Sequence, residues 1–236
     1  MLIHALGCLG AALSMSLSWP QVYKSCVQRR TNGLSPTATA LGVAMPLGWI
    51  TYGLLSGERL QVMTNLVTGT AGLAILAALV LTQPAVRSGR VLKVSAGSAA
   101  GVLAVVLVSL AAAALPGVSG HAVAPLLGMV LAGVSLLSAI PQPLSLLRDR
   151  HQDLSGLSPL RWRMAFASGL SWFCYGVATA QTAVWMSASI GITASAIVCT
   201  VLFVRRERTP VDVETYAGIR CWRDSVTTRN FAMVGV

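Results

Sequence analysis

Charged residues are scarce in this 236-residue chain. They make up 10% of it, against 55% hydrophobic residues, and the mean hydropathy is +0.71. A soluble domain ordinarily carries about 25% charged residues. Such a shortage excludes an ordinary soluble globular protein, so we expect an all-α membrane protein embedded in the lipid bilayer.

The residues that carry most enzyme chemistry are also few. There are seven acidic residues and three histidines, and the five cysteines show no C-x-x-C spacing, which argues against a zinc site or a disulfide framework. No nucleophile lies beside a base within an expected helix. We therefore expect no enzyme activity, no cofactor and no metal. All the acidic residues fall in expected loops or in the tail: Glu58, Asp149, Asp153, Glu207, Asp212, Glu214 and Asp224.

One stretch of sequence is present twice, from Leu17 to Gly57 and again from Ala139 to Gly176. Each copy has a Pro-Gln pair, a Gly-Leu-Ser-Pro segment, a tryptophan thirteen residues after the second proline, and a Tyr-Gly pair three residues later. Self-similarity at this long period predicts two like halves joined by an unmatched segment. The matched residues are Pro20-Gln21 with Pro141-Gln142, Pro36 with Pro159, Trp49 with Trp172, and Tyr52 with Tyr175.

Seven apolar stretches are about long enough to cross a hydrocarbon core of roughly 30 Å. They lie near residues 2–22, 34–56, 60–82, 91–115, 122–147, 157–180 and 182–204. The first has no basic residue before it, so we interpret it as a retained helix and not a signal peptide. The predicted organisation is a first triple-helix repeat at 1–83, a linker with the fourth helix at 84–120, a second repeat at 121–205, and a flexible cytoplasmic tail at 206–236.

Lysine and arginine collect on one side of these expected helices. Sixteen of the seventeen follow the first, third or fifth helix or lie in the tail, and Arg59 alone lies on the other side. Cytoplasmic loops carry the basic excess, so we place the amino terminus outside and the carboxyl terminus in the cytoplasm. The net charge of +10 is spread over short loops that face lipid headgroups, which argues against a nucleic-acid partner.

These paired Pro-Gln motifs, with an unpaired helix between the repeats, resemble the PQ-loop superfamily of transporters. The W-x-x-Y-G segments are most similar to its SWEET and SemiSWEET (MtN3/saliva) sugar-transporter branch. The resemblance covers residues 1 to about 204. It implies two parallel triple-helix bundles joined by the fourth helix, with a substrate held near the membrane midplane between them.

A candidate pocket follows from the same residues. Trp49 and Trp172 fall in mid-helix, away from the interfacial belt where tryptophan is enriched, and an indole can stack on the C–H face of a sugar. Asn65 comes sixteen residues after Trp49, which matches the SWEET pattern of one tryptophan and one asparagine per repeat. The second repeat departs from it, with Ala188 at that spacing, flanked by Ser187 and Ser189. The alternative is that Asn65 only bonds neighbouring helices.

The motif prolines are candidate hinges. Proline weakens a helix at a fixed level, so a bend becomes easy at Pro20 and Pro141, and Gln21 or Gln142 can hydrogen-bond the carbonyls that are released. The resemblance extends the hinge role to Pro36 and Pro159, although proline is also well tolerated in the first turn of a helix. By the same resemblance Tyr52 and Tyr175, with Glu58 and Arg59 nearby, are candidate gate residues.

The sequence therefore predicts a transporter of a small neutral solute, a sugar or a similar polar molecule, that works by alternating access. Because no acidic residue lies within an expected helix, we expect an uncoupled facilitator. Two alternatives stay open: a proton-coupled amino-acid or cystine-type PQ-loop transporter, and a non-transporting receptor or sorting protein. A homo-oligomer also stays open. The excess of arginine over lysine, 15 to 2, indicates a GC-rich genome, and we expect a bacterial cytoplasmic membrane.

Overall fold

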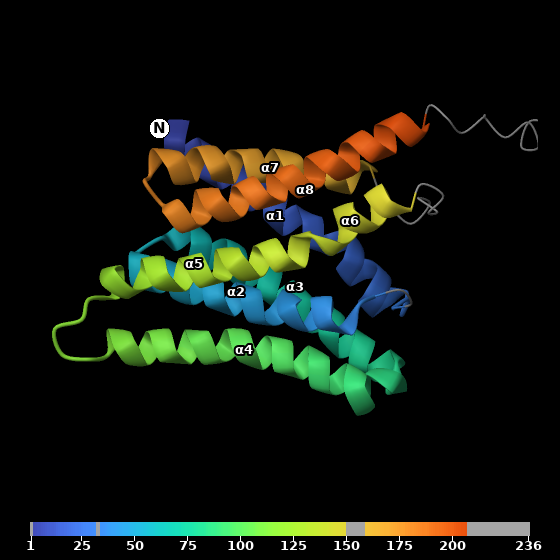
Figure 1. Ribbon diagram of the computed structural model, residues 1–236, viewed down its shortest axis with the longest axis horizontal. Coiled ribbons are helices and arrows are strands. Elements are labelled where there is room, and N and C mark those ends of the chain that lie inside the picture. Colours follow the sequence, from blue (N-terminus) through green and yellow to red (C-terminus); the bar gives the residue numbers. More distant parts are fainter. Residues whose placement is uncertain (1, 32–33, 150–158, 207–236) are drawn as a thin grey trace, which may run out of the picture. The chain divides into compact units, whose positions relative to one another are not determined.

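A computed structural model describes residues 2–31, 34–149 and 159–206 (Figure 1). The described chain contains helices and no strand, with two irregular helices, the π-helical η1 (Tyr23–Val27) and the 3-10 helix η2 (Pro84–Arg87), and a short α6 (Pro141–Arg148). The long helices are α1 (Leu2–Val22), α2 (Pro36–Ser56), α3 (Arg59–Thr82), α4 (Gly89–Ala113), α5 (Gly120–Ala139), α7 (Pro159–Ala178) and α8 (Thr182–Arg206).

The chain divides into two compact units, residues 1–199 and 200–236. Within the second unit the structure describes only the end of α8, and the predicted tail at 206–236 lies outside the described residues except for Arg206. The packing described below is that of the first unit.

Six of the long helices are long and apolar enough to cross a membrane, namely α1, α2, α3, α4, α5 and α8. The protein is therefore an integral membrane protein. We expected seven spans. In the described chain α7 does not meet the same standard, because Arg161 and Arg163 lie in its first two turns and lower its mean hydropathy.

Six helices, three from each repeat, form a ring in the spatial order α1, α3, α2, α5, α8, α7. In the first repeat α3 packs against both α1 and α2. In the second, α8 lies against α7 where Gly176 meets Trp185, and against α5 where Gly128 meets Ala183. The two repeats meet through α1 against α7 and through α2 against α5, while α4 packs against α2 and α5 on the outside. The first helix of each repeat thus contacts the second helix of the other.

These two contacts between the repeats are built alike, with a small residue opposite a larger one. Along α2 and α5, a side-chain carbon at Gly48 would lie 2.5 Å from Leu131 Cδ2. Along α1 and α7, a carbon at Gly10 would lie 3.3 Å from Ser171 Cβ. Gly48 matches Ser171 in the repeat, so the small residue changes sides between the two contacts.

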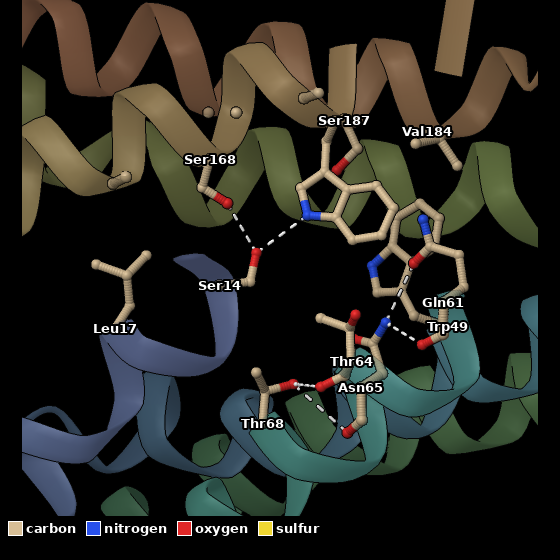
Figure 2. A pocket seen from close by; sticks show the side chains of 15 residues that line it. Ser14, Leu17, Trp49, Gln61, Thr64, Asn65, Thr68, Ser168, Val184 and Ser187 are labelled. Carbon is tan, nitrogen blue, oxygen red and sulfur yellow. Dashed lines mark hydrogen bonds between the residues drawn. The ribbon is translucent and has the colours of Figure 1, made fainter. Parts of the chain in front are cut away.

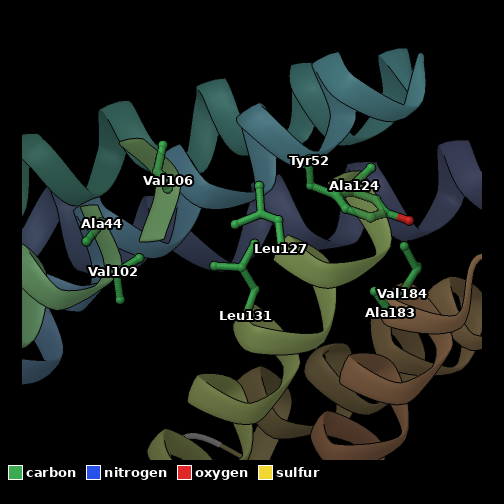
Figure 3. Close-up of a cluster of buried hydrophobic side chains, with 9 residues drawn as sticks. All are labelled: Ala44, Tyr52, Val102, Val106, Ala124, Leu127, Leu131, Ala183 and Val184. Atoms are coloured by element: carbon green, nitrogen blue, oxygen red, sulfur yellow. The ribbon is translucent and has the colours of Figure 1, made fainter. Parts of the chain in front are cut away.

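The hydrophobic core lies where α2, α4, α5 and α8 meet (Figure 3). Its members are small or branched side chains and one tyrosine, which lets the helices approach closely. The buried residues are Ala44, Tyr52, Val102, Val106, Ala124, Leu127, Leu131, Ala183 and Val184. This core holds one side of the ring together.

Local sequence explains where the helices of the first repeat begin and end. The Ser35 side chain accepts a hydrogen bond from Ala38 N, and Pro36 is the first residue of α2, a position that proline favours. At the other end Gly57 has φ of 75°, a left-handed conformation that glycine adopts without steric cost. This allows the immediate turn into α3. We call the end of the bundle at this turn the tyrosine end, and the opposite end the Pro-Gln end.

The chain departs from regular α-helix near both Pro-Gln segments. Pro20 lies inside α1, and the chain then continues as the π-helical η1. In the second repeat α5 ends at Ala139, and α6 begins at Pro141 and leaves the line of α5 (Figure 1). These changes do not fall at equivalent residues, because α1 runs through Pro20 to Val22 whereas α5 ends before Pro141. Loss of a backbone donor at each proline favours both.

Candidate functional site

A cavity of about 270 Å³ lies inside the ring of helices (Figure 2). Helices α1, α2, α3, α7 and α8 contribute side chains to it, and none of these side chains is ionisable. The lining residues are Ser14, Leu17, Trp49, Gln61, Thr64, Asn65, Thr68, Ala165, Ser168, Gly169, Trp172, Val184, Ser187, Ala188 and Gly191.

Two walls of this cavity come from equivalent stretches of the repeats. The spacing i, i+3, i+4, i+7 puts four residues on one helix face, and both α3 and α8 use it. The α3 wall is Gln61, Thr64, Asn65 and Thr68, and the α8 wall is Val184, Ser187, Ala188 and Gly191. Every member of the α8 wall comes 123 residues after its counterpart, the same offset that relates Trp172 to Trp49.

Four of the five predicted pocket residues line this cavity: Trp49, Asn65, Trp172 and Ser187. The structure places Ser189 elsewhere. Its hydroxyl donates to the Trp185 carbonyl oxygen at 2.7 Å, and it faces a separate apolar cavity beside α5 and α6. Gln61 was not predicted, although it lies one helical turn before Asn65 and a turn spacing could have indicated it.

The indole of Trp172 is held by hydrogen bonds that join the two repeats. Its Nε1 donates to Ser14 Oγ at 3.0 Å, and the Ser14 and Ser168 hydroxyls lie 2.8 Å apart (Figure 2). Ser168 Oγ also donates to the Gly10 carbonyl oxygen at 3.1 Å. The indole N–H of Trp49, by contrast, has no hydrogen-bond partner among the described residues.

Along the α3 wall, Asn65 is oriented by the residue one turn before it. Its Nδ2 donates to the carbonyl oxygen of Gln61 at 2.9 Å and to Gln61 Oε1 at 3.2 Å. Thr68 Oγ1 donates to the Thr64 carbonyl oxygen at 3.1 Å. Thr64 Oγ1 is enclosed and has no hydrogen-bond partner in the described chain. The wall therefore has polar groups that the protein itself does not satisfy.

A reciprocal pair of hydrogen bonds joins the repeats at the tyrosine end. Tyr175 donates from its hydroxyl to Glu58 Oε2 at 2.7 Å, and Tyr52 donates to Gln181 Oε1 at 3.4 Å. Gln181 comes 123 residues after Glu58, so each tyrosine bonds the residue that precedes the third helix of the other repeat. We call these four residues the tyrosine latch. Gln181 was missed from the sequence, although its repeat position could have indicated it.

Each latch tyrosine also rests against a glycine of the other repeat. A side-chain carbon at Gly7 would lie 2.8 Å from Tyr175 Cδ2, and one at Gly128 would lie 2.9 Å from Tyr52 Cε2. These glycines occupy matched positions on α1 and α5. A larger residue there would displace the ring, so the absence of a side chain is what lets the tyrosines reach across.

The latch is in direct contact with the cavity through the tryptophans. Trp49 and Tyr52 meet edge to face with ring centroids 5.4 Å apart, and Trp172 and Tyr175 do so at 5.7 Å. Such pairs contribute about 0.5–1.5 kcal/mol beyond their buried area. A molecule that moves either indole will therefore press on a tyrosine that holds the repeats together.

The predicted hinge residues lie away from the cavity. Gln21 Nε2 donates to Ser25 Oγ at 2.9 Å, so its amide nitrogen bonds a hydroxyl in η1, where we expected a bond to released helix carbonyls. Pro36 and Pro159 are the first residues of α2 and α7. Pro141 and Gln142 begin α6, and their side chains lie outside the described residues.

Comparison with known proteins gives one kind of match. No family model and no curated protein sequence matches the chain. Among solved structures, the chain is similar to a eukaryotic SWEET transporter, with a TM-score of 0.66 over 87% of this chain and 97% of that one. The chain shares the fold of that SWEET transporter. Sequence identity is 15%, so the match establishes the fold, while function has to be argued from the site.

Proposed function

We propose that this protein is a SWEET-like PQ-loop membrane transporter for a small neutral solute, a sugar or a similar polar molecule. It moves the solute by alternating access, without coupling to a proton gradient. The observation that carries the proposal is the cavity between the two repeats, with one tryptophan from each and polar side chains beside them. Parallel repeats that hold a substrate at their interface are a known transporter plan.

The lining of the cavity favours an uncharged substrate. None of its side chains is ionisable, so an ion inside it would lack a partner charge. Burying an unpaired charge is far more costly than burying a hydrogen-bonded polar group. Hydroxyl and amide groups suit the serine, threonine, asparagine and glutamine side chains, and the two indoles offer flat apolar faces.

The latch and the Pro-Gln interruptions suit movement between two states. Hydrogen bonds of the tyrosine latch close one end across the repeats, and the interrupted helices at the other end can bend. Opening one end while the other closes would carry a solute past the tryptophans. We assign Pro20, Pro36, Pro141 and Pro159 as hinges, with Gln21 and Gln142, and Tyr52 and Tyr175 as gate residues.

Uncoupled movement is favoured by where the acidic residues lie. Among the described residues, Glu58 precedes α3 at the tyrosine end and Asp149 follows α6 at the Pro-Gln end. A coupled transporter ordinarily carries an ionisable group at membrane depth. A proton-coupled carrier that used an acidic residue would have to use one of these two, or one that lies outside the described residues, such as Asp153.

Flux into sealed proteoliposomes tests both parts of this proposal. We expect counterflow of at least one solute from a panel of sugars, amino acids and polyols, with net uptake that stops at equilibrium whether or not a pH gradient is imposed. Uptake above equilibrium under an inward proton gradient, lost in Asp149→Asn or Asp153→Asn, would instead assign the coupled mechanism. Absence of flux for the whole panel would favour the receptor or sorting alternative.

We further propose that α7 is a seventh span, that the Pro-Gln end faces the cytoplasm, and that residues 1–83 and 121–205 are the two functional repeats. Arg161 and Arg163 are then cytoplasmic flanking charges. A bacterial cytoplasmic membrane is proposed from the arginine excess alone, since the SWEET transporter compared above is eukaryotic.

A further inference from the structure

The two walls of the cavity differ in chemistry although they are equivalent in the repeat. Position by position, the α3 wall has an amide where the α8 wall has hydrocarbon, twice, at Gln61 against Val184 and at Asn65 against Ala188. Figure 2 shows Val184 and Ser187 across the cavity from the four residues of the α3 wall. A third difference is Thr68 against Gly191.

Unused hydrogen-bonding groups gather in the first repeat. Both bonds of Asn65 use Nδ2, and Gln61 is bonded through Oε1, so Asn65 Oδ1 and Gln61 Nε2 are not engaged by any described residue. Thr64 is 4% exposed and its Oγ1 has no partner in the described chain. The unpaired indole N–H of Trp49 lies in the same repeat. These groups include both donors and acceptors for a ligand.

In the second repeat the corresponding groups are absent or already used. Trp172 donates its N–H to Ser14, and Ser187 Oγ donates to Ser135 Oγ at 3.4 Å. Val184 and Ala188 are 3% and 9% exposed and offer only methyl groups. A ligand hydroxyl pressed against this wall would lose water without gaining a donor or an acceptor, a loss equivalent to about tenfold to a hundredfold in affinity.

We propose that the solute is amphipathic, with its hydroxyl or amide groups along the edge that faces α3 and a hydrocarbon edge that faces α8. The cavity, at about 270 Å³, is just below the usual range of about 300–1,000 Å³ for ligand pockets, so the solute is of monosaccharide size. A deoxy sugar that has a methyl group in place of one hydroxymethyl fits this description better than a fully hydroxylated hexose does. This inference rests on the proposed transport function.

The test compares matched sugars in the proteoliposome assay. D-glucose and 6-deoxy-D-glucose differ by one hydroxyl, and we expect the 6-deoxy sugar to enter about tenfold faster at equal low concentration. The complementary sugar is 3-deoxy-D-glucose, which lacks a hydroxyl on the polar edge. Its flux is expected to be lower than that of glucose. Equal rates for glucose and 6-deoxyglucose, or faster glucose, would overturn the inference and leave the transport function standing.

Substitutions on the α8 wall are expected to weaken this preference. Ala188→Asn places in the second repeat the amide that Asn65 provides in the first. Ala188→Ser and Val184→Thr are smaller changes, which keep the fold if the asparagine side chain is too large. Each is expected to reduce the ratio of 6-deoxyglucose to glucose flux by about threefold or more. Thr193→Asn is the matched control, because Thr193 is exposed on the same helix and does not line this cavity.

The two failures are distinguishable. If neither these sugars nor the wider panel is transported, the proposed function is wrong and this inference is wrong with it. If sugars are transported but the flux ratio is the same in the wild type, in Ala188→Ser and in Thr193→Asn, only the division of the cavity into a polar and an apolar wall is wrong.

Discussion

The hydroxyl of Tyr175 donates a 2.7 Å hydrogen bond to the carboxylate of Glu58, while its counterpart Tyr52 makes a 3.4 Å bond to Gln181. The pairing of repeat positions in the latch is thus symmetric, but the lengths and strengths of its two hydrogen bonds are not. Hydrogen bonds to charged groups contribute about 1.5–3 kcal/mol, whereas neutral bonds contribute about 0.5–1.5 kcal/mol and weaken as they lengthen.

This inequality predicts the effect of removing each hydroxyl. Tyr175→Phe should loosen the tyrosine end more than Tyr52→Phe does, with faster amide hydrogen exchange at the start of α3 and α8. Glu58→Gln keeps an acceptor for Tyr175 and should fall between them. Exchange followed by mass spectrometry in nanodiscs measures the order. Equal exchange in both phenylalanine variants would contradict the assignment of Glu58 as the stronger partner.

Gly128 and Gly7 provide a second prediction, because each leaves room for a tyrosine ring. In Gly128→Ala the new methyl would collide with Ala183 Cβ and press on Tyr52. Overpacking of this kind typically costs about 1–3 kcal/mol. Gly7→Ala should cost less, because one of its close neighbours is the flexible end of Leu60. Thermal unfolding in detergent measures both losses.

The control for these glycines is Gly97→Ala on α4. No atom outside the local helix lies within 4 Å of a side-chain carbon there, so alanine should be neutral or stabilise by up to about 1 kcal/mol through backbone entropy. A stability loss in Gly97→Ala as large as that in Gly128→Ala would show that contact with the tyrosine is not the cause.

The cavity residues provide a third prediction. Trp49→Ala, Trp172→Ala and Asn65→Ala should each abolish flux while the protein still inserts into the membrane, and Trp172→Ala should lower thermal stability because it removes the indole bond to Ser14. Trp172→Phe should also destabilise the contact between α1 and α7, since it leaves Ser14 without its indole donor. Trp49→Phe removes no such bond. Normal flux in all three alanine variants, with flux lost in Pro20→Ala, would refute the cavity assignment and retain the hinge.

A fourth prediction concerns orientation and the seventh span. Alkaline phosphatase fused after Arg30 or Arg150 should be inactive, since both positions are expected in the cytoplasm. A fusion after Gln181 should be active if α7 crosses the membrane. Activity after Arg150 would reverse the orientation, and an inactive fusion after Gln181 would show that α7 does not span.

The spacing of the repeats in the sequence predicts much of the candidate site. Because equivalent helices keep their phase across a duplication, the offset that pairs Trp49 with Trp172 also pairs Asn65 with Ala188, and all four line the cavity. Ser187 and Ser189 were both predicted because they flank Ala188. Each step along a helix turns the side chain by about 100°, so two residues two positions apart point to opposite sides and only one of them can line the cavity. Only the full i, i+3, i+4, i+7 pattern separates the inner serine from the outer one.

Other features depend on contacts between distant segments. The bond from Tyr175 to Glu58 spans 117 residues, and the sequence suggested only that Glu58 lay near Tyr52. Regular helix is lost near each Pro-Gln pair, but in different ways: α1 continues through Pro20 and the chain becomes π-helical from Tyr23, whereas a new helix begins at Pro141. Proline removes a hydrogen bond in both cases, and the surrounding packing decides how the chain continues.

The covalent connection of the two repeats has a consequence for how selectivity can change over evolutionary time. In a symmetric pair of identical half-length chains, every substitution would appear on both sides of the cavity at once. Here Ala188 can differ from Asn65 because one polypeptide encodes both. Joining the halves in one chain therefore lets one wall of the cavity change while the other wall stays as it is.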